Sequence, residues 1–105
     1  MNRGEIWYYE FKKPDKSRPV LILTRQEMIS HLNTVTVVPV TRTIRGVPSE
    51  LLLSQEEGLK ERCAANLHHL NTVPKNQLKK FIGTLHPTKM EELKEALLFA
   101  LGFDE

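Results

Sequence analysis

Residues Thr34–Val40 restrict the possible folds most strongly, because every residue in this segment except Pro39 is β-branched. β-branched side chains are stiff at χ1, which lowers helix propensity and favours the pleated surface of a strand. Pro19–Leu23 is nearly continuous apolar sequence and predicts a second, buried strand. Its proline stands at the start, where a missing backbone donor is tolerated. We therefore expect a β-sheet at the centre of the fold.

Short segments of similar character surround these two. The pattern predicts further strands over residues 5–11, 49–53, 63–67, 70–73 and 81–85. It predicts a short helix over residues 26–32, loops over 12–17 and 55–58, and a turn over 44–48. Each apolar segment is only long enough for one short strand, so a compact, strand-rich domain is expected.

The last sixteen residues change to a helical period. Apolar residues recur there at helical spacing: Met90, Leu93, Ala96, Leu97, Ala100 and Leu101. Thr88 and Glu91 form a candidate capping box, and Gly102 stands where a helix is expected to end. The prediction is an α+β fold in one domain over residues 1–105, a partly open barrel of strands closed by a terminal helix.

Charge is unevenly distributed along the chain, although the net charge is only +2. Residues 1–48 carry eight Lys and Arg against four Asp and Glu, and residues 49–105 carry seven against nine. An excess of positive charge in one half suggests a surface that meets an anionic partner, although a solvated surface gives the same pattern. There is no signal-peptide pattern, no apolar run of about 20 residues and only one cysteine, so we expect a cytoplasmic protein without membrane contact.

Arg18 and Thr41 are the residues most suggestive of chemistry. Arg18 stands at the start of one predicted strand, and Thr41 begins a threonine-rich, basic turn at the end of another. A guanidinium keeps its proton in proteins and presents a fork of donors that fits phosphate oxygens. A threonine hydroxyl can donate to the same phosphate. The pair therefore indicates a site that holds a nucleic-acid backbone and stabilises charge developing on phosphorus.

Histidine and cysteine do not form a metal-binding pattern in this sequence. His68 and His69 are neighbours, and neighbouring side chains of a strand point to opposite faces, so we expect one packed ring and one solvated ring. No His and Cys residues have zinc-like spacing, and no metal or cofactor is expected. Cys63 is interpreted as a small packed residue. His31 and His86 are assigned to a helix end and a cap region.

Aromatic residues gather in the first predicted strand, where Trp7 and Tyr9 share one face and Tyr8 takes the other. Such rings stack bases in proteins that bind single strands, but packing in a core or a dimer interface is their commoner role. Lys12, Lys13 and Lys16 stand close to Arg18 and can guide RNA, although exposed lysines also serve solubility alone.

Six blocks of the sequence, in the same order and over nearly the whole chain, resemble the MazF/PemK family of toxin endoribonucleases. They are Arg3–Trp7, Arg18–Leu21, Pro39–Gly46, Ala65–Leu67 with Thr72–Val73, Ile82–Leu85, and Glu95–Leu97 through Leu101–Gly102. The resemblance implies an SH3-like barrel that forms a homodimer and cleaves single-stranded RNA, including mRNA, at short sequence motifs without a metal. It also implies a cognate antitoxin with a disordered, often acidic tail.

The resemblance assigns roles to particular residues. It places the family's catalytic arginine on Arg18 and its catalytic threonine on Thr41. We further expect RNA contacts from residues near them and from the segment after Asn66: Lys16, Ser17, Arg42, Thr43, Arg45 and His69. His69 is the most interesting candidate for a general base, because histidine titrates in the useful pH range.

The sequence departs from the family pattern at two places. The loop before Arg18 is short and lacks the family's Gly-Ser-Glu-Gln, so an assisting glutamate has no counterpart, and Asp15 is a poor substitute by position. His68-His69 replaces the frequent Asp-Gln. Two alternatives therefore stay open beside the nuclease: a CcdB-like toxin that binds DNA gyrase without cutting anything, and a degenerate member that binds RNA without turnover.

Overall fold

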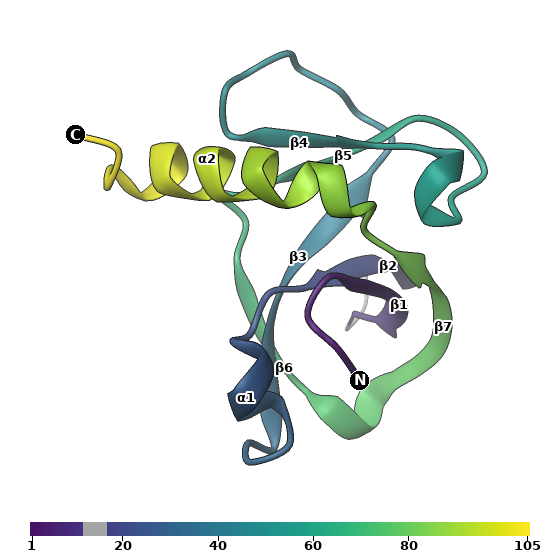
Figure 1. Ribbon diagram of the computed structural model, residues 1–105. Helices are drawn as coiled ribbons and strands as arrows, with labels where there is room; N and C mark the ends of the chain where they lie inside the picture. Colours follow the sequence, from purple (N-terminus) through teal and green to yellow (C-terminus); the bar gives the residue numbers. More distant parts are fainter. Residues whose placement is uncertain (12–16) are drawn as a thin grey trace.

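A computed structural model describes residues 1–11 and 17–105 of the chain. Seven antiparallel strands form one sheet in the order β4-β5-β3-β2-β1-β7, and β6 also pairs with β3 (Figure 1). The strands are β1 (Glu5–Glu10), β2 (Ser17–Ile22), β3 (Thr34–Thr41), β4 (Glu50–Leu53), β5 (Cys63–Asn66), β6 (Asn71–Pro74) and β7 (Leu78–Thr84). This architecture confirms the predicted strand-rich, partly open barrel.

β3 determines the shape of the sheet, because its two halves have different neighbours. Residues 34–37 pair with β6, whereas Val40 and Thr41 pair with β5. β2 pairs with the middle of β3, and β1 lies between β2 and β7. The strands β1, β2, β3, β6 and β7 curve into a ring, while β4 and β5 extend away from it (Figure 1).

A predicted helix, a predicted loop and a predicted strand differ from the structure. Helix α1 (Gln26–Ile29) is a single turn that ends before residue 32, because one turn is enough to connect the antiparallel neighbours β2 and β3. Residues 55–57, predicted as loop, form a 3-10 helix, η1 (Gln55–Glu57), whose capping box joins Ser54 and Glu57. β7 begins three residues before the predicted strand, since an edge strand tolerates exposed lysines that hide the strand pattern.

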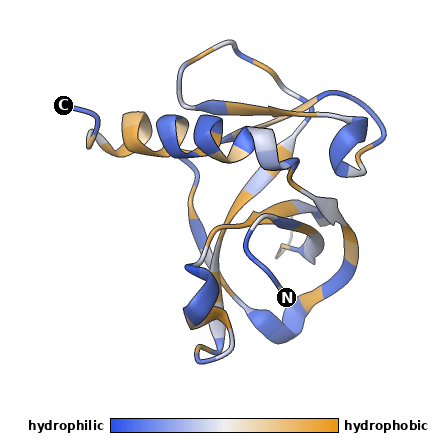
Figure 2. Cartoon of the chain, viewed as in Figure 1, coloured by the Kyte–Doolittle hydropathy of each residue, from blue (hydrophilic) through white to orange (hydrophobic). Residues whose placement is uncertain are grey.

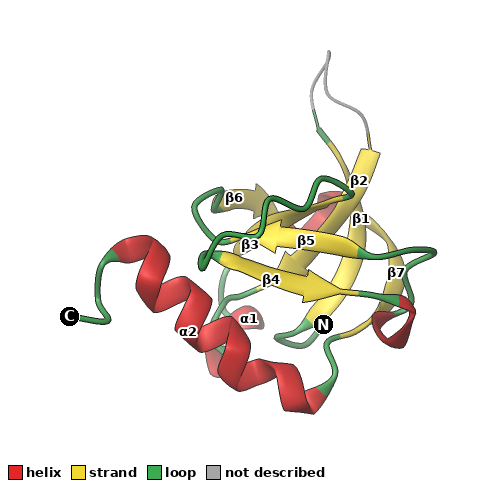
Figure 3. Cartoon of the chain, turned by 90° about the horizontal axis from the view of Figure 1, so that it is seen from above, coloured by secondary structure: helices red, strands yellow, loops and turns green. Residues whose placement is uncertain are grey.

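Helix α2 (Met90–Leu101) covers β4 at one side of the sheet (Figure 3). It ends as predicted at Gly102, which adopts a left-handed conformation with φ of 77°. The Thr88–Glu91 capping box is wrong, because Thr88 lies in a preceding 3-10 turn, η3 (Pro87–Lys89). There the Thr88 hydroxyl is 2.8 Å from Nδ1 of His86, which also accepts from the Thr88 N–H.

α2 is amphipathic, as its mixed colours show (Figure 2). Leu93 and Ala96 are buried in the middle of its apolar stripe, whereas Leu101 at its end is 50% exposed. None of the helices in residues 1–11 and 17–105 is long and apolar enough to cross a membrane.

Both faces of the central strands β2 and β3 are buried. One core cluster, which includes Leu21 and Val38, packs against α2 through Leu93 and Ala96. The other fills the ring and includes the alternate residues of the same strands: Val20, Ile22, Val35 and Val37. The burial of both faces explains why the two segments are nearly continuous apolar sequence.

A buried carboxylate connects the segment after β4 to the start of α2. Glu57 is 1% exposed and lies 2.9 Å from Nζ of Lys89, and it accepts hydrogen bonds from the N–H groups of Ser54 and His86. Gly58 and Gly83 pack backbone against backbone beside it, so that a Cβ on Gly58 would lie 2.6 Å from the Ile82 carbonyl oxygen. This contact fixes the first part of the segment that leads into β5.

Candidate functional site

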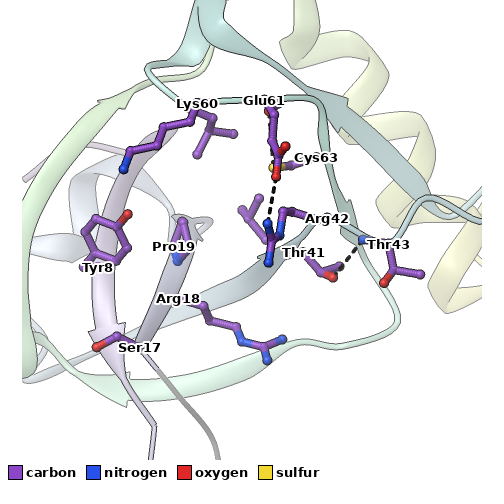
Figure 4. A pocket seen from close by; sticks show the side chains of 12 residues that line it. Tyr8, Ser17, Arg18, Pro19, Thr41, Arg42, Thr43, Lys60, Glu61 and Cys63 are labelled. Atoms are coloured by element: carbon purple, nitrogen blue, oxygen red, sulfur yellow. Dashed lines mark hydrogen bonds and ion pairs between the residues drawn. The ribbon is translucent and has the colours of Figure 1, made fainter.

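A pocket of about 530 Å³ opens where β1, β2 and β3 meet the segment that leads into β5. Its size falls in the range typical of ligand sites. Twelve of the described residues line it (Figure 4): Tyr8, Ser17, Arg18, Pro19, Val40, Thr41, Arg42, Thr43, Leu59, Lys60, Glu61 and Cys63.

Strand pairing brings Arg18 and Thr41 to this pocket from different parts of the sequence. Arg18 is the second residue of β2, and Thr41 is the last residue of β3. The strands are antiparallel, with Val20 opposite Pro39, so the start of β2 lies beside the end of β3. Both side chains are partly buried, which limits their motion.

Thr41 is further fixed by the turn that follows it. The backbone N–H of Thr43 donates to Oγ1 of Thr41 at 3.1 Å (Figure 4). A hydroxyl that accepts one hydrogen bond still has its own proton to donate. Thr41 can therefore offer a donor to a ligand in the pocket.

Arg42 and Glu61 form an ion pair at the pocket, with Nη1 of Arg42 at 3.1 Å from Oε1 of Glu61. The two side chains are 82% and 54% exposed, so the attraction is weak and a ligand can replace it. Within the described part of the lining, Arg18, Arg42 and Lys60 supply positive charge against the carboxylate of Glu61. The lining therefore favours an anion.

The predicted RNA-contacting residues separate into three groups. Ser17, Arg42 and Thr43 line the pocket beside Arg18 and Thr41. Arg45 and His69 are exposed and do not line it, and Lys16 lies outside the described residues.

The turn that carries Arg45 is held by Glu50, which accepts from the N–H groups of Arg45, Gly46 and Val47. Burial by itself would raise the pKa of Glu50, but these three hydrogen bonds outweigh it and lower the pKa. The carboxylate thus stays charged and fixes the backbone between β3 and β4.

The predicted alternation of His68 and His69 across a strand is wrong. β5 ends at Asn66, and both histidines follow it as exposed residues. The Asn66 side chain accepts from the His68 N–H, and its backbone carbonyl accepts from the His69 N–H, so the chain turns there instead of extending the strand. His31 follows α1, and His86 caps the turn before α2, as predicted.

Sequence reasoning missed Lys60 and Glu61 as pocket residues. Their segment has no regular pattern, and only its attachment through Glu57 and Leu59 places it over the end of β3. Tyr8 was named only as a possible stacking residue. The predicted division of the aromatic faces is confirmed: Trp7 and Tyr9 pack against the cluster inside the ring, whereas Tyr8 lines the pocket.

Cys63 is a buried residue of β5, as predicted. Burial, and to a lesser extent the charge of Glu61, raise the pKa of its thiol, so it stays protonated and is a poor nucleophile at neutral pH. No group of three or more His, Cys, Asp or Glu within the described ranges is arranged to hold a metal ion.

The chain matches, over residues 2–101, a family described as "PemK-like, MazF-like toxin of type II toxin-antitoxin system". Among curated proteins it is similar to the probable endoribonuclease MazF2 of Mycobacterium tuberculosis, with 35% identity over 103 residues that cover 97% of this chain and 99% of that protein. Endoribonuclease MazF3 of the same organism is 38% identical over 90 residues, or 86% of this chain and 87% of that protein.

Solved structures show the same relationship. The Mycobacterium tuberculosis toxin MazF-mt6 has a TM-score of 0.86 and 35% identity, covering 93% of this chain and 96% of that one. A mycobacterial endoribonuclease in complex with its cognate antitoxin has the same TM-score at 24% identity, covering 97% of this chain and 95% of that one, and therefore shares the fold.

Proposed function

The chain belongs to the family of PemK-like, MazF-like toxins of type II toxin–antitoxin systems, and we infer that it is an endoribonuclease that cleaves single-stranded RNA. The observation that carries this inference is the pocket in which Arg18 and Thr41 meet beside Arg42 and Lys60. The curated relatives are named endoribonucleases, which favours cleavage over a CcdB-like role in binding gyrase and over a degenerate, non-cutting member.

The proposed reaction uses the substrate's own 2′-hydroxyl as nucleophile. Its oxygen forms a bond to the neighbouring phosphorus and loses its proton, while the bond from phosphorus to the 5′-oxygen breaks and that oxygen gains a proton. The products are a 2′,3′-cyclic phosphate and a 5′-hydroxyl end. Negative charge grows on the non-bridging oxygens during attack, so donors already fixed in position stabilise the transition state most.

Arg18 and Thr41 are the proposed catalytic donors. Two N–H groups of the Arg18 guanidinium pair with the non-bridging oxygens, and the Thr41 hydroxyl adds a third donor. Ser17, Arg42 and Thr43 contact the flanking backbone within the pocket. Arg45 contacts phosphates outside the pocket, and the RNA contact predicted for Lys16 falls outside the described residues. The RNA contact proposed for His69 lies outside the pocket, so a role as general base has no support from its position.

The proposed partners follow from the family. A cognate antitoxin with an acidic tail would place carboxylates near Arg18, Arg42 or Arg45 and would compete with RNA. The protein is proposed to act as a homodimer in the cytoplasm, where mRNA is available. Exposed apolar side chains at the end of α2, among them Phe99, Leu101 and Phe103, offer surface that a dimer can bury.

The test is incubation of the purified protein with a long single-stranded RNA in excess EDTA, followed by mapping of the cut sites and analysis of their ends. Discrete cuts with 5′-hydroxyl and cyclic phosphate ends are expected. Intact RNA, with a protein that is folded and dimeric, would contradict the proposed activity and would make gyrase the next target to examine.

A further inference from the structure

The pocket extends beyond the residues that the proposed reaction uses. Arg18, Thr41 and Thr43 occupy one side of it, and Tyr8 with Lys60 occupies the other (Figure 4). A phosphate needs donors and positive charge, which the first side supplies. The Tyr8 hydroxyl and Lys60 can also donate to a phosphate, but the face of the Tyr8 ring is an apolar surface that a phosphate does not use, so this side has room for a different ligand group.

The position of Tyr8 in the sheet is well defined. β1 lies between β2 and β7, and Tyr8 pairs with Pro19 on one neighbour and with Lys80 on the other. Directly paired residues of an antiparallel sheet present their side chains on the same face. A row therefore runs from Pro19 through Tyr8 to Lys80, with an apolar ring at one end and an ammonium at the other.

The environment of Tyr8 differs from that of the other rings on β1. Trp7 donates to Glu5 through Nε1 and meets Phe81 edge to face, and Tyr9 donates to Gln77 and packs on Phe11. Tyr8 is half-buried and lines the pocket. Among the described residues, none accepts a hydrogen bond from its hydroxyl, and its side chain lines the pocket on the same side as Lys60 (Figure 4).

An aromatic ring flanked by an apolar proline and by lysines matches the chemistry of a nucleobase and its backbone. Bases stack on tyrosine in proteins that bind single strands, while positive charge follows the phosphates. Lys60 lines the pocket together with Tyr8, and Lys80 continues the charge past it. Both sides belong to one pocket, so a base attached next to a phosphate bound at Arg18 and Thr41 can reach the side of Tyr8.

We propose that Tyr8, with Pro19 and Lys60, forms a subsite that binds the base of one nucleotide next to the cleaved phosphate. The proposal rests on the proposed function, because it names the RNA group that this side of the same pocket takes. Stacking holds the base without reading its edges, and the subsite thus positions the strand for attack at Arg18 and Thr41.

The test is an abasic scan of binding. A short oligonucleotide is selected from a 2′-fluoro RNA pool, which cannot undergo 2′-hydroxyl attack, and each position is made abasic in turn. Binding is followed by fluorescence anisotropy. One position is expected to lose roughly five- to 150-fold in affinity with the wild-type protein, the range for one stacked base.

Three variants test whether the base at that critical position stacks on the Tyr8 ring. Tyr8→Ala should bind the intact oligonucleotide as weakly as wild type binds the critical abasic one, with no further loss at that position. Tyr8→Phe retains the ring, so its affinity should again fall when the critical position is made abasic. Phe81→Ala, which removes an exposed ring off the pocket, is the matched control. If Tyr8→Ala does not fold by circular dichroism, Tyr8→Leu keeps the apolar bulk and replaces it.

The failures are distinguishable. If Tyr8→Ala loses affinity equally for every abasic oligonucleotide, including the critical one, or if Tyr8→Phe behaves like Tyr8→Ala, the subsite is overturned while cleavage of RNA in EDTA is unaffected. If the wild type loses affinity at one abasic position, as expected, but cuts no RNA, the subsite stands and the proposed activity fails. A folded protein that binds no RNA overturns both.

Discussion

Oγ1 of Thr41 accepts a hydrogen bond from the backbone N–H of Thr43 at 3.1 Å. This contact restricts the direction of the hydroxyl and leaves its proton available to the pocket. It adds to the restriction that partial burial and the branched Cβ already place on the Thr41 side chain at the end of β3. Donors held in place before the reaction stabilise a transition state without further ordering cost.

Thr41→Val is expected to lower the single-turnover cleavage rate by about 10²–10³, the effect of removing one fixed donor. Valine keeps the shape and the β propensity of threonine but has no hydroxyl. Thr41→Ser retains the donor and should lose much less. Equal rates for the valine variant and wild type would remove Thr41 from the proposed catalytic pair.

Glu61→Gln should strengthen binding of uncleavable RNA by roughly two- to fivefold at low salt. Among the described residues that line the pocket, Glu61 is the one acidic side chain, and it pairs with Arg42, so an anionic ligand has to displace it. The gain should shrink as salt rises, because both groups are exposed. Glu95→Gln on α2 makes the same charge change away from the pocket. An equal gain in both variants would mean that only net charge matters.

Glu57→Gln is expected to destabilise the protein at pH 7 by on the order of 3–5 kcal/mol, since it breaks a buried ion pair and leaves Lys89 without its counter-charge. The free energy of unfolding, measured by urea titration, checks this value. Glu56→Gln, an exposed neighbour on η1, is the control and should change little.

The same carboxylate makes stability depend on pH. Burial would raise the pKa of Glu57, but the hydrogen bonds from Lys89 and from backbone N–H groups outweigh it and lower the pKa from 4.5. Its stabilising effect is therefore complete above pH 4.5 and is lost as the pH falls through the lower value of the folded state. Urea midpoints should decline below that pH in wild type and less steeply in Glu57→Gln. Parallel declines would contradict the assignment.

Gly83→Ala should destabilise the protein by about 1–3 kcal/mol or more, because its Cβ would overlap the carbonyl oxygen of Glu57. Backbone atoms cannot rotate away as a flexible side chain can. Thr84→Ala, at the exposed neighbouring position, is the control. A lower urea midpoint at an unchanged slope is expected for the glycine variant alone.

The sequence indicated those parts of the fold in which burial leaves a periodic pattern. β2 and β3 were predicted closely because both of their faces are buried, and α2 because its stripe of leucines follows one period. The start of β7 was predicted three residues late, since Lys79 and Lys80 face solvent at a sheet edge. The 3-10 helix after Ser54 was missed because a turn of three residues leaves no periodicity.

For the site, the sequence could indicate residues at strand ends but not those in irregular segments. Arg18 and Thr41 could be paired because the ends of two neighbouring strands meet. The segment of Lys60 and Glu61 is attached at Glu57, which depends on contacts with residues 29 and 32 positions away in the chain. Such contacts have no local signature.

The central claim is that Arg18 stabilises charge on the cleaved phosphate, and the most direct measurement is the single-turnover cleavage rate of Arg18→Ala in EDTA. The matched control is Arg25→Ala, which removes an exposed arginine 75% open to solvent and outside the pocket. We expect a loss of about 10²–10³ for Arg18→Ala and little change for Arg25→Ala. A near-wild-type rate for a folded Arg18→Ala protein would contradict the account.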